Sequence, residues 1–279
     1  MFSKFYNRGL KKASTIKFKL LNKNCTEIRI PRNNLRFLVT TDLAWAFSSG
    51  DYYEKNVIYF LDEVVKSYHQ PVLIDVGANC GYFSTRYAAQ CKNVFSFEPV
   101  KGTFSLLKRN FKRNGIRNAV PFNLGLSNAP GQLSINIYNS SGNNSIFERK
   151  IPKEHSLKKI GVELIKLDTL DNLIEKGVVS SPNIIKIDVE GAELLVLGGA
   201  AKTILKHRPT ILMEYSENTS NDAGYAKEEL LSVLMLDDYS IFGIPEDEQD
   251  LALIEQANFQ THKISNVIFV PRERKLFFG

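Results

Sequence analysis

The sequence predicts an α/β protein with a doubly wound, mostly parallel seven-stranded sheet, an antiparallel hairpin at the sheet edge and an N-terminal helical and β extension. Two patterns predict this fold. After Pro71, short β-branched runs alternate with helical segments, which is typical of parallel strands that helices bury on both faces. The last two apolar runs, "YSIFGI" and "NVIFVPR", follow one another without a clear long helix and predict the antiparallel pair. We therefore divide the chain into an extension, residues 1–50, and a main domain, residues 51–279.

The extension carries the positive charge of the chain. Residues 1–26 hold seven basic and no acidic side chains, whereas the remainder of the chain has a net charge of −1. This nearly neutral remainder argues against a nucleic-acid enzyme with a basic cleft. Apolar residues recur at helical spacing in residues 1–23, which predicts a basic amphipathic helix that contacts an anionic membrane surface. A packing helix with a solvated basic back explains the same pattern equally well.

The elements follow in chain order. Residues 26–39 alternate like a β-hairpin whose turn holds Pro31, and residues 51–68 have helical spacing that ends before Pro71. After "AVPFNLGLS", the run "GQLSINIYN" alternates like a strand. The strands and helices of the main domain are expected in "PVLIDVG", "YFSTRYAAQC", "NVFSFEP", "TFSLLKRNFKRN", "AVPFNLGLS", "NIIKIDVEG", "AELLVLGGAAKTILKH", "PTILMEYS" and "AKEELLSVLML".

Composition limits the compartment. No run approaches the roughly 18 apolar residues of a membrane-spanning helix, and no cleavable signal is recognised, so we expect a cytoplasmic protein with peripheral membrane contact at most. The cysteines, Cys25, Cys80 and Cys91, are too few and too unevenly spaced for a disulfide framework or a four-ligand zinc site. We expect three free thiols.

The loop after the first strand of the main domain points to a cofactor. In "IDVGANCG" an acid, Asp75, precedes two glycines, Gly77 and Gly81, in the spacing D-x-G-x-x-x-G. A dinucleotide loop normally reads G-x-G-x-x-G, and an acid at this position would repel a pyrophosphate. A cofactor with a cationic amino-acid end and no phosphate fits instead, which describes S-adenosylmethionine. Glu98 ends the next strand about twenty residues later, where a carboxylate can accept both ribose hydroxyls.

This loop and four later motifs resemble the FkbM-type S-adenosylmethionine-dependent methyltransferases, a family within the Rossmann-like methyltransferase class. The motifs are "FSFEP", "LDTL", "IIKIDVEGAELLVLGGA" and "RPTILMEYSE", and the resemblance extends over residues 50–270. It implies O-methyl transfer to a hydroxyl of a sugar, glycolipid or polyketide. The cofactor residues that it implies are Asp75, Gly77, Ala78, Asn79 and Gly81 at the methionine end, Glu98 and Pro99 at the ribose, Gly125 and Leu126 near the adenine, and Asp188 facing the methyl group.

Two other functions are weighed against this one. A non-catalytic S-adenosylmethionine-binding regulatory module would not need the intact set of motif residues from Asp75 to Asp188. An NAD-dependent oxidoreductase is disfavoured by the spacing of the glycine loop.

Three acids are candidates for catalysis. Asp188 and Glu190 follow the fourth main strand in "KIDVEGAE", where either is placed to act as general base, with Glu214 as an orienting group. The helix dipole explains Glu190 equally well, and a strand-capping role explains Glu214. Lys186, on the same strand, is placed to pair with an acid. Metal assistance requires two or three carboxylates with an amide, and we find no third ligand beside Asp188 and Glu214, so no metal is expected.

Other residues receive weaker assignments. Cys80 faces the methionine end of the loop, so covalent catalysis is not expected. His155 is the one histidine placed as a base on a mobile loop. Residues 52–54, Tyr-Tyr-Glu, are candidates for a lid over the cofactor, and the Ser/Asn/Gly cluster at 139–145 is either a substrate rim or a plain surface turn.

Overall fold

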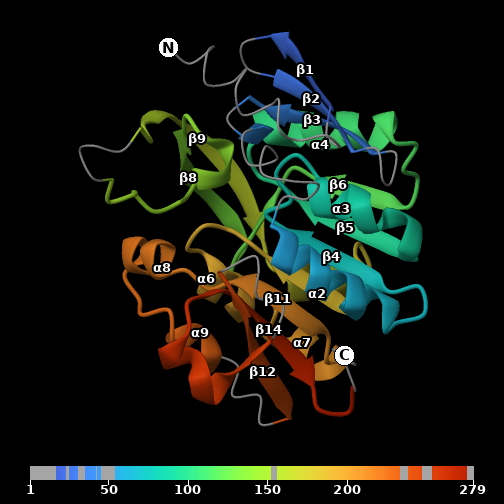
Figure 1. Cartoon of the computed structure of the whole chain (residues 1–279), viewed down its shortest axis with the longest axis vertical. Coiled ribbons are helices and arrows are strands. Elements are labelled where there is room, and N and C mark those ends of the chain that lie inside the picture. Colours follow the sequence, from blue (N-terminus) through green and yellow to red (C-terminus); the bar gives the residue numbers. More distant parts are fainter. Residues whose placement is uncertain are drawn as a thin grey trace.

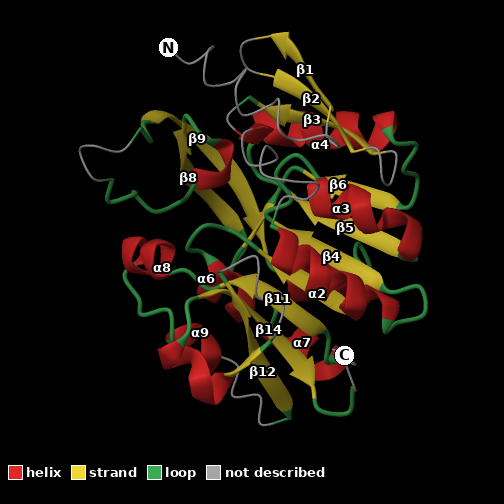
Figure 2. Cartoon of the chain, viewed as in Figure 1, coloured by secondary structure: helices red, strands yellow, loops and turns green. Residues whose placement is uncertain are grey.

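A central eight-stranded sheet organises the protein (Figures 1 and 2). The computed structural model describes residues 17–22, 25–30, 35–41, 43–44, 54–151, 156–232, 238–246 and 253–274. In spatial order the strands are β13 (Ile254–Glu255), β12 (Tyr239–Pro245), β14 (Ile264–Pro271), β11 (Thr210–Glu214), β10 (Ile184–Ile187), β4 (Val72–Val76), β5 (Asn93–Phe97) and β6 (Ala119–Phe122). The strands from β11 to β6 are parallel, and β12, β13 and β14 are antiparallel additions.

The predicted fold class is confirmed, with one strand more than the expected seven. The additional strand, β13, has two residues and pairs with β12, which was too short a segment for a sequence pattern to reveal. β4 lies between β5, the next strand of the chain, and β10, which comes much later, so the strand order reverses beside β4. Ligands of doubly wound sheets bind at this switch point, beyond the carboxyl ends of the strands.

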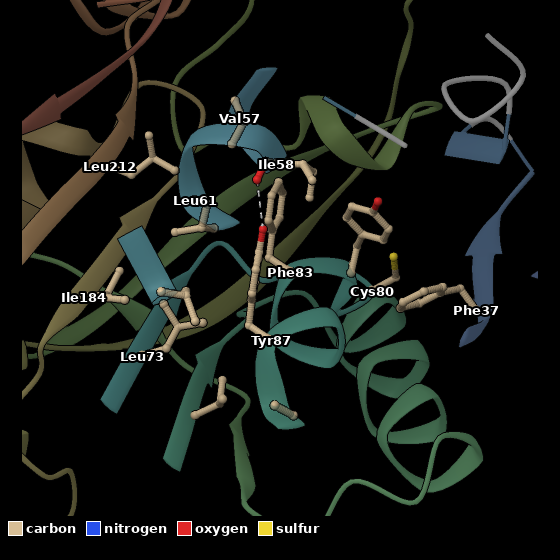
Figure 3. Packing of buried hydrophobic residues seen from close by; sticks show 14 of the residues in the cluster. Phe37, Val57, Ile58, Leu61, Leu73, Cys80, Phe83, Tyr87, Ile184 and Leu212 are labelled. Carbon is tan, nitrogen blue, oxygen red and sulfur yellow. Dashed lines mark hydrogen bonds between the residues drawn. The ribbon is translucent and has the colours of Figure 1, made fainter. Parts of the chain in front are cut away.

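Helices bury both faces of the sheet, as continuous apolar strands require. Along β4, Leu73 joins one hydrophobic cluster with helix α2 (Lys55–Lys66) and helix α3 (Tyr82–Tyr87), whereas Ile74 joins another cluster on the opposite face. Figure 3 shows the first cluster, in which Tyr87 Oη donates to Ile58 O at 3.3 Å. The remaining helices are α4 (Lys101–Arg113), α5 (Leu170–Glu175), α6 (Glu193–Gly198), α7 (Ala201–His207), α8 (Glu217–Ala223) and α9 (Glu229–Ser232), with short 3-10 turns η3 (Ala88–Gln90), η4 (Ser141–Asn143) and η5 (Gln256–Thr261). Within the described residues, none of these helices is long and apolar enough to cross a membrane.

The N-terminal strands form a separate three-stranded antiparallel sheet, β1 (Lys17–Asn22), β2 (Cys25–Ile30) and β3 (Leu35–Thr40). The expected hairpin is confirmed, but the expected helix over residues 1–23 is wrong for residues 17–22, because their backbone pairs with β2. Residues 1–16 and 23 lie outside the described part of the chain. The sheet packs on α4, where the Asn110 side chain accepts from Leu38 N at 2.7 Å and donates to Leu38 O at 2.8 Å. The boundary at residue 50 stays a prediction, and the sheet shares a hydrophobic cluster with α2 across it.

A third, three-stranded sheet extends from the side of the central sheet (Figure 1), in the order β7 (Gly125–Leu126), β9 (Lys159–Asp168), β8 (Gly131–Tyr138). The expected single strand over "AVPFNLGLS" therefore divides between two sheets. Asn123 lies at the division, and its side chain donates to Glu98 O at 3.0 Å and Pro99 O at 2.7 Å. The expected helix after β10 is likewise divided into α6 and α7, beside Gly199, whose Cα packs against Ser127 O.

Candidate functional site

The glycine loop after β4 is held against both neighbouring strands. Gly77 N and Ala78 N both donate to Phe97 O, at 3.0 and 2.9 Å. Gly77 has a φ of +79°, and a Cβ at this position would lie 1.7 Å from Asp188 O, so only glycine fits. Asn79 also has a positive φ, 49°, which asparagine tolerates better than most residues. The loop conformation thus brings the ends of β4, β5 and β10 together.

The close approach at Gly77 predicts a specific loss of stability. Gly77→Ala should destabilise the protein by about 2 kcal/mol or more, because a left-handed alanine and a collision with backbone both cost free energy. Urea unfolding measures this change. Gly177→Ala is the matched control, since Gly177 has a similar φ of +69° but nothing within 4 Å of the added Cβ. Equal losses in the two variants would show that contact with Asp188 does not require the glycine.

Glu98 connects the glycine loop to the start of α4. Its Oε2 accepts from Asn79 N at 2.9 Å, and its Oε1 accepts from Val100 N at 2.9 Å and Thr103 Oγ1 at 2.8 Å. Burial raises the pKa of Glu98 to about 7, although the three hydrogen bonds lower it. The carboxylate therefore changes its charge near neutral pH while it lies on a cavity wall.

Two predicted cofactor residues lie behind the loop and do not line the cavity. Asp75 is buried, and its Oδ2 accepts from Ser84 N at 3.1 Å and Ser84 Oγ at 2.5 Å. Burial raises the pKa of Asp75, which Lys186 opposes. Gly81 begins α3 with a φ of +81°, and a Cβ there would lie 2.3 Å from Leu107 Cδ1. Both residues therefore shape the loop in this structure.

The other predicted residues surround one cavity of about 400 Å³ at the switch point. The predicted residues on its walls are Gly77, Ala78, Asn79, Glu98, Pro99, Gly125, Leu126, Asp188, Glu190 and Glu214. Asn79 Oδ1 is buried and has no hydrogen-bond partner among the described residues, so it is available to a donor on a ligand. The cavity thus combines an unused acceptor, a carboxylate and a glycine-lined wall, which fits a cofactor with an amino-acid end and a ribose.

Three carboxylates converge on the cavity wall. Asp188, Glu190 and Glu214 each place one oxygen within 4.8 Å of the other two. The sequence revealed no third acid for a metal site, and this expectation needs correction, because the turn after β10 brings Glu190 beside the other two. Asn266 pairs with Glu214 across β11 and β14 and also lines the cavity. Three carboxylates with an amide nearby are groups that can ligate a hard divalent cation.

Cations already pair with two of these acids. Lys186 Nζ donates to Asp188 Oδ2 at 2.9 Å, as expected, and lies 4.4 Å from the centroid of the Phe83 ring. Burial lowers the pKa of Lys186, but the facing carboxylates, led by Asp188, raise it above its ordinary value overall. Arg149 donates to Glu190 Oε2, and its other terminal nitrogen lies 3.5 Å from Asp222 Oδ2.

The remaining acid, Glu214, is the least compensated of the three. Its Oε2 is buried and has no hydrogen-bond partner in the described part of the chain. Burial, with repulsion from Glu190 and Asp188, raises the pKa of Glu214 well above its usual value. Burial also raises the pKa of Glu190, and Arg149 opposes that shift. Glu214 is consequently the acid whose ionised form most needs a hydrogen-bond donor or a cation beside it.

The loop that carries Glu190 is shaped by Glu193. Glu190 has a φ of 57° and Gly191 a φ of +105°. Glu193 Oε1 accepts from Val189 N at 3.2 Å and Gly191 N at 3.3 Å, which stabilises this turn. Glu193 thus bonds the free N–H groups before α6, the role that the helix-dipole interpretation offered for Glu190, whereas Glu190 pairs with Arg149.

The weaker assignments divide. Cys80 is buried and burial raises its pKa to about 12, so the thiol stays protonated, in agreement with the expectation against covalent catalysis. Ser141 and Asn144 lie on the cavity wall, which favours the substrate-rim interpretation of 139–145. Glu54 also lines the cavity, whereas Tyr52, Tyr53 and His155 lie outside the described residues.

Several cavity residues carry no local signal in the sequence. Ile135, Ile165 and Leu167 of the third sheet form an apolar wall beside Gly125. Ser265 and Asn266 come from the closing hairpin. The expected antiparallel edge was the one clue to the second group, since it places β14 beside β11.

Comparison with known proteins is consistent with this geometry. Residues 75–249 match a methyltransferase FkbM domain. The chain is 34% identical over 151 residues to hexuronic acid methyltransferase AglP of Haloferax volcanii, a match that covers 54% of this chain and 58% of that protein. It is 32% identical over 157 residues to methyltransferase sdnD of Sordaria araneosa, covering 46% of this chain and 60% of the relative. The matches therefore span about three fifths of the length of these curated relatives. A solved methyltransferase FkbM from Methylobacillus flagellatus KT is similar with a TM-score of 0.46 and 18% identity, covering 72% of this chain and 44% of that one.

Proposed function

Since the chain belongs to the FkbM methyltransferase family, we propose that it is an S-adenosylmethionine-dependent O-methyltransferase acting on a hydroxyl of a glycan, glycolipid or other polyhydroxylated small molecule. One observation carries this proposal. The glycine loop with Glu98 and the acids Asp188 and Glu214 line the same cavity. The similarity to a hexuronic acid methyltransferase supports a sugar acceptor.

The cofactor would occupy the β4 and β5 end of the cavity. Asn79 Oδ1 would accept from the ammonium group, and the Glu98 carboxylate would accept from the ribose hydroxyls. Pro99 would lie beside the ribose, and Gly125 and Leu126 would contact the adenine. Asp75 and Gly81 would act indirectly, by holding the loop through Ser84 and by admitting α4.

The methyl group of the cofactor supplies the electrophile, and the protein must orient and deprotonate the acceptor. We assign proton removal to Asp188, whose carboxylate the Lys186 ammonium holds in place. Asp188 would accept the proton of the acceptor hydroxyl while the bound cofactor supplies the methyl group. Glu214 would orient the acceptor through a hydrogen bond, and Glu190 would support the same wall through Arg149.

The direct test is calorimetric titration with S-adenosylmethionine at several pH values. Two ribose donors stabilise the ionised form of Glu98, so binding should release a proton wherever Glu98 is protonated in the free protein. With the pKa of Glu98 at about 7, affinity should be constant above pH 8 and about tenfold weaker at pH 6. Conversely, because the folded pKa lies above the unfolded value, the contribution of Glu98 to folding stability falls as the pH rises from about 4.5 to 7.

Two results would contradict these statements. Folded protein that binds neither S-adenosylmethionine nor S-adenosylhomocysteine would remove the proposed function. A pH dependence that survives unchanged in Glu98→Gln would assign the titration to another group. Transfer of a labelled methyl group to a component of a cell extract, followed by mass spectrometry, then identifies the acceptor.

We also propose a cytoplasmic protein that contacts an anionic membrane surface. The basic residues 1–23 support this proposal from the sequence. In the structure, Ile160, Val162 and Leu164 on one face of β9 are 66%, 56% and 60% exposed, and Lys166 continues the row. Large apolar side chains in a row beside a basic group are typical of an interaction surface.

Vesicle flotation tests the membrane contact. The full chain should float with anionic vesicles, and recovery should fall when residues 1–16 are deleted, a cut that leaves β1 intact, or when Leu164 is replaced by glutamate. Leu205→Glu is the matched control, because Leu205 is 67% exposed on α7, away from β9. Equal recovery of all four proteins would contradict the proposal.

A further inference from the structure

The cavity walls are strongly acidic. Among the described residues on the walls, six carboxylates face a single ammonium group. The carboxylates are those of Glu54, Glu98, Asp188, Glu190, Glu214 and Glu246, and the ammonium group is that of Lys186. Lys186 already donates to Asp188, so its positive charge is largely compensated by that carboxylate.

The neighbouring Arg149 does not change this balance of charge on the cavity wall. Arg149 is 7% exposed, does not line the cavity and pairs with both Glu190 and Asp222. Glu246 is exposed at the end of β12, where solvent weakens its field. The deeper carboxylates act in a less polar medium, where charge interactions are stronger.

One buried oxygen shows what this wall lacks. Glu214 Oε2 has no hydrogen-bond partner among the described residues, and Glu190 and Asp188 repel its negative charge. A hydroxyl or ammonium donor on a ligand would satisfy this oxygen. A ligand carboxylate would face three acids and find no unpaired cation on the described walls.

We propose that the cavity selects its ligands by positive charge, so that it prefers a cationic cofactor to the neutral product and an uncharged or amino-bearing acceptor to a carboxylate-bearing one. This inference rests on the proposed function and adds the charge class of the acceptor to it, a class that would differ from the hexuronic acid in the name of the relative AglP. Methyl transfer removes the sulfonium charge that the acids attract, so the product should bind more weakly than the cofactor and be released.

The cofactor part is tested without turnover. Calorimetry compares S-adenosylhomocysteine with sinefungin, an analogue in which a protonated amine replaces the methylated sulfonium. Sinefungin should bind at least tenfold tighter, and Glu214→Gln should reduce that ratio several-fold. Glu175→Gln is the control, since Glu175 is exposed on α5 and does not line the cavity. S-adenosylhomocysteine binding as tightly as sinefungin would overturn the inference, whereas absence of binding by both would overturn the proposed function.

The acceptor part uses three matched p-nitrophenyl β-D-glycosides, a glucoside, a glucosaminide and a glucuronide, with labelled S-adenosylmethionine. The glucuronide should have a kcat/KM at least tenfold below the other two, and Glu246→Lys should narrow that difference. A glucuronide that equals or exceeds the others overturns the inference. A glucuronide that becomes the best acceptor only when magnesium chloride is added also overturns it, because a cation held by the three carboxylates would then set the selectivity. Methylation of none of the three overturns the acceptor part, and the sinefungin ratio still decides the cofactor part.

Discussion

Replacing Asp188 with asparagine should lower kcat by about 10²–10⁴-fold, the usual contribution of a positioned general base. Asparagine keeps the size of the side chain and an oxygen that Lys186 can bond, but it cannot accept the proton of the acceptor hydroxyl. The dissociation constant for S-adenosylmethionine should change far less than kcat, because the ribose and methionine contacts remain. Labelled methyl transfer to a glycoside acceptor gives kcat, and calorimetry gives the dissociation constant.

Glu190→Gln separates the two candidate bases. Glu190 pairs with the buried Arg149, so its neutral variant should lose stability and show a smaller loss of kcat than Asp188→Asn. An Asp188→Asn enzyme with nearly full activity, beside an inactive but folded Glu190→Gln enzyme, would transfer the general-base role to Glu190. Thermal unfolding of both variants shows whether a loss of activity is caused by a loss of folded protein.

Replacing Glu98 with glutamine should weaken S-adenosylmethionine binding by about 10²-fold or more. The loss follows from two charge-assisted hydrogen bonds to the ribose, each contributing about 1.5–3 kcal/mol. The NH₂ group of glutamine would also face a backbone N–H from which Glu98 now accepts a hydrogen bond, such as that of Asn79 or Val100. Calorimetry measures the affinity.

Glu163→Gln is the matched control for this variant. Glu163 Oε1 accepts from Lys101 N at 3.1 Å at the start of α4, much as Glu98 does from Val100, but Glu163 does not line the cavity. Wild-type affinity in Glu163→Gln with a large loss in Glu98→Gln supports the ribose role. Similar affinities in both variants would remove Glu98 from the cofactor site.

Local sequence patterns were sufficient to predict the structure wherever residues close in the sequence decide the backbone conformation. The β-branched runs predicted the parallel strands, because a strand buried on both faces must be apolar throughout. The loop spacing from Asp75 to Gly81 predicted a glycine loop at a cofactor site, and Gly77 shows why no other residue fits there. The same information failed over residues 17–22, where pairing with β2 overrides a helical apolar spacing.

The sequence by itself determined the fold class, the family resemblance and the strand ends that carry the acids, because these depend on patterns within short segments. Only the tertiary structure decided that Asp75 turns to Ser84, that Glu190 joins Asp188 and Glu214, and that the third sheet closes one wall of the cavity. The physical reason is that these arrangements depend on strand register and on packing between segments far apart in the chain. The direction of a side chain and the electrostatic field around it are set by residues that are distant in the sequence, and a local pattern does not identify them.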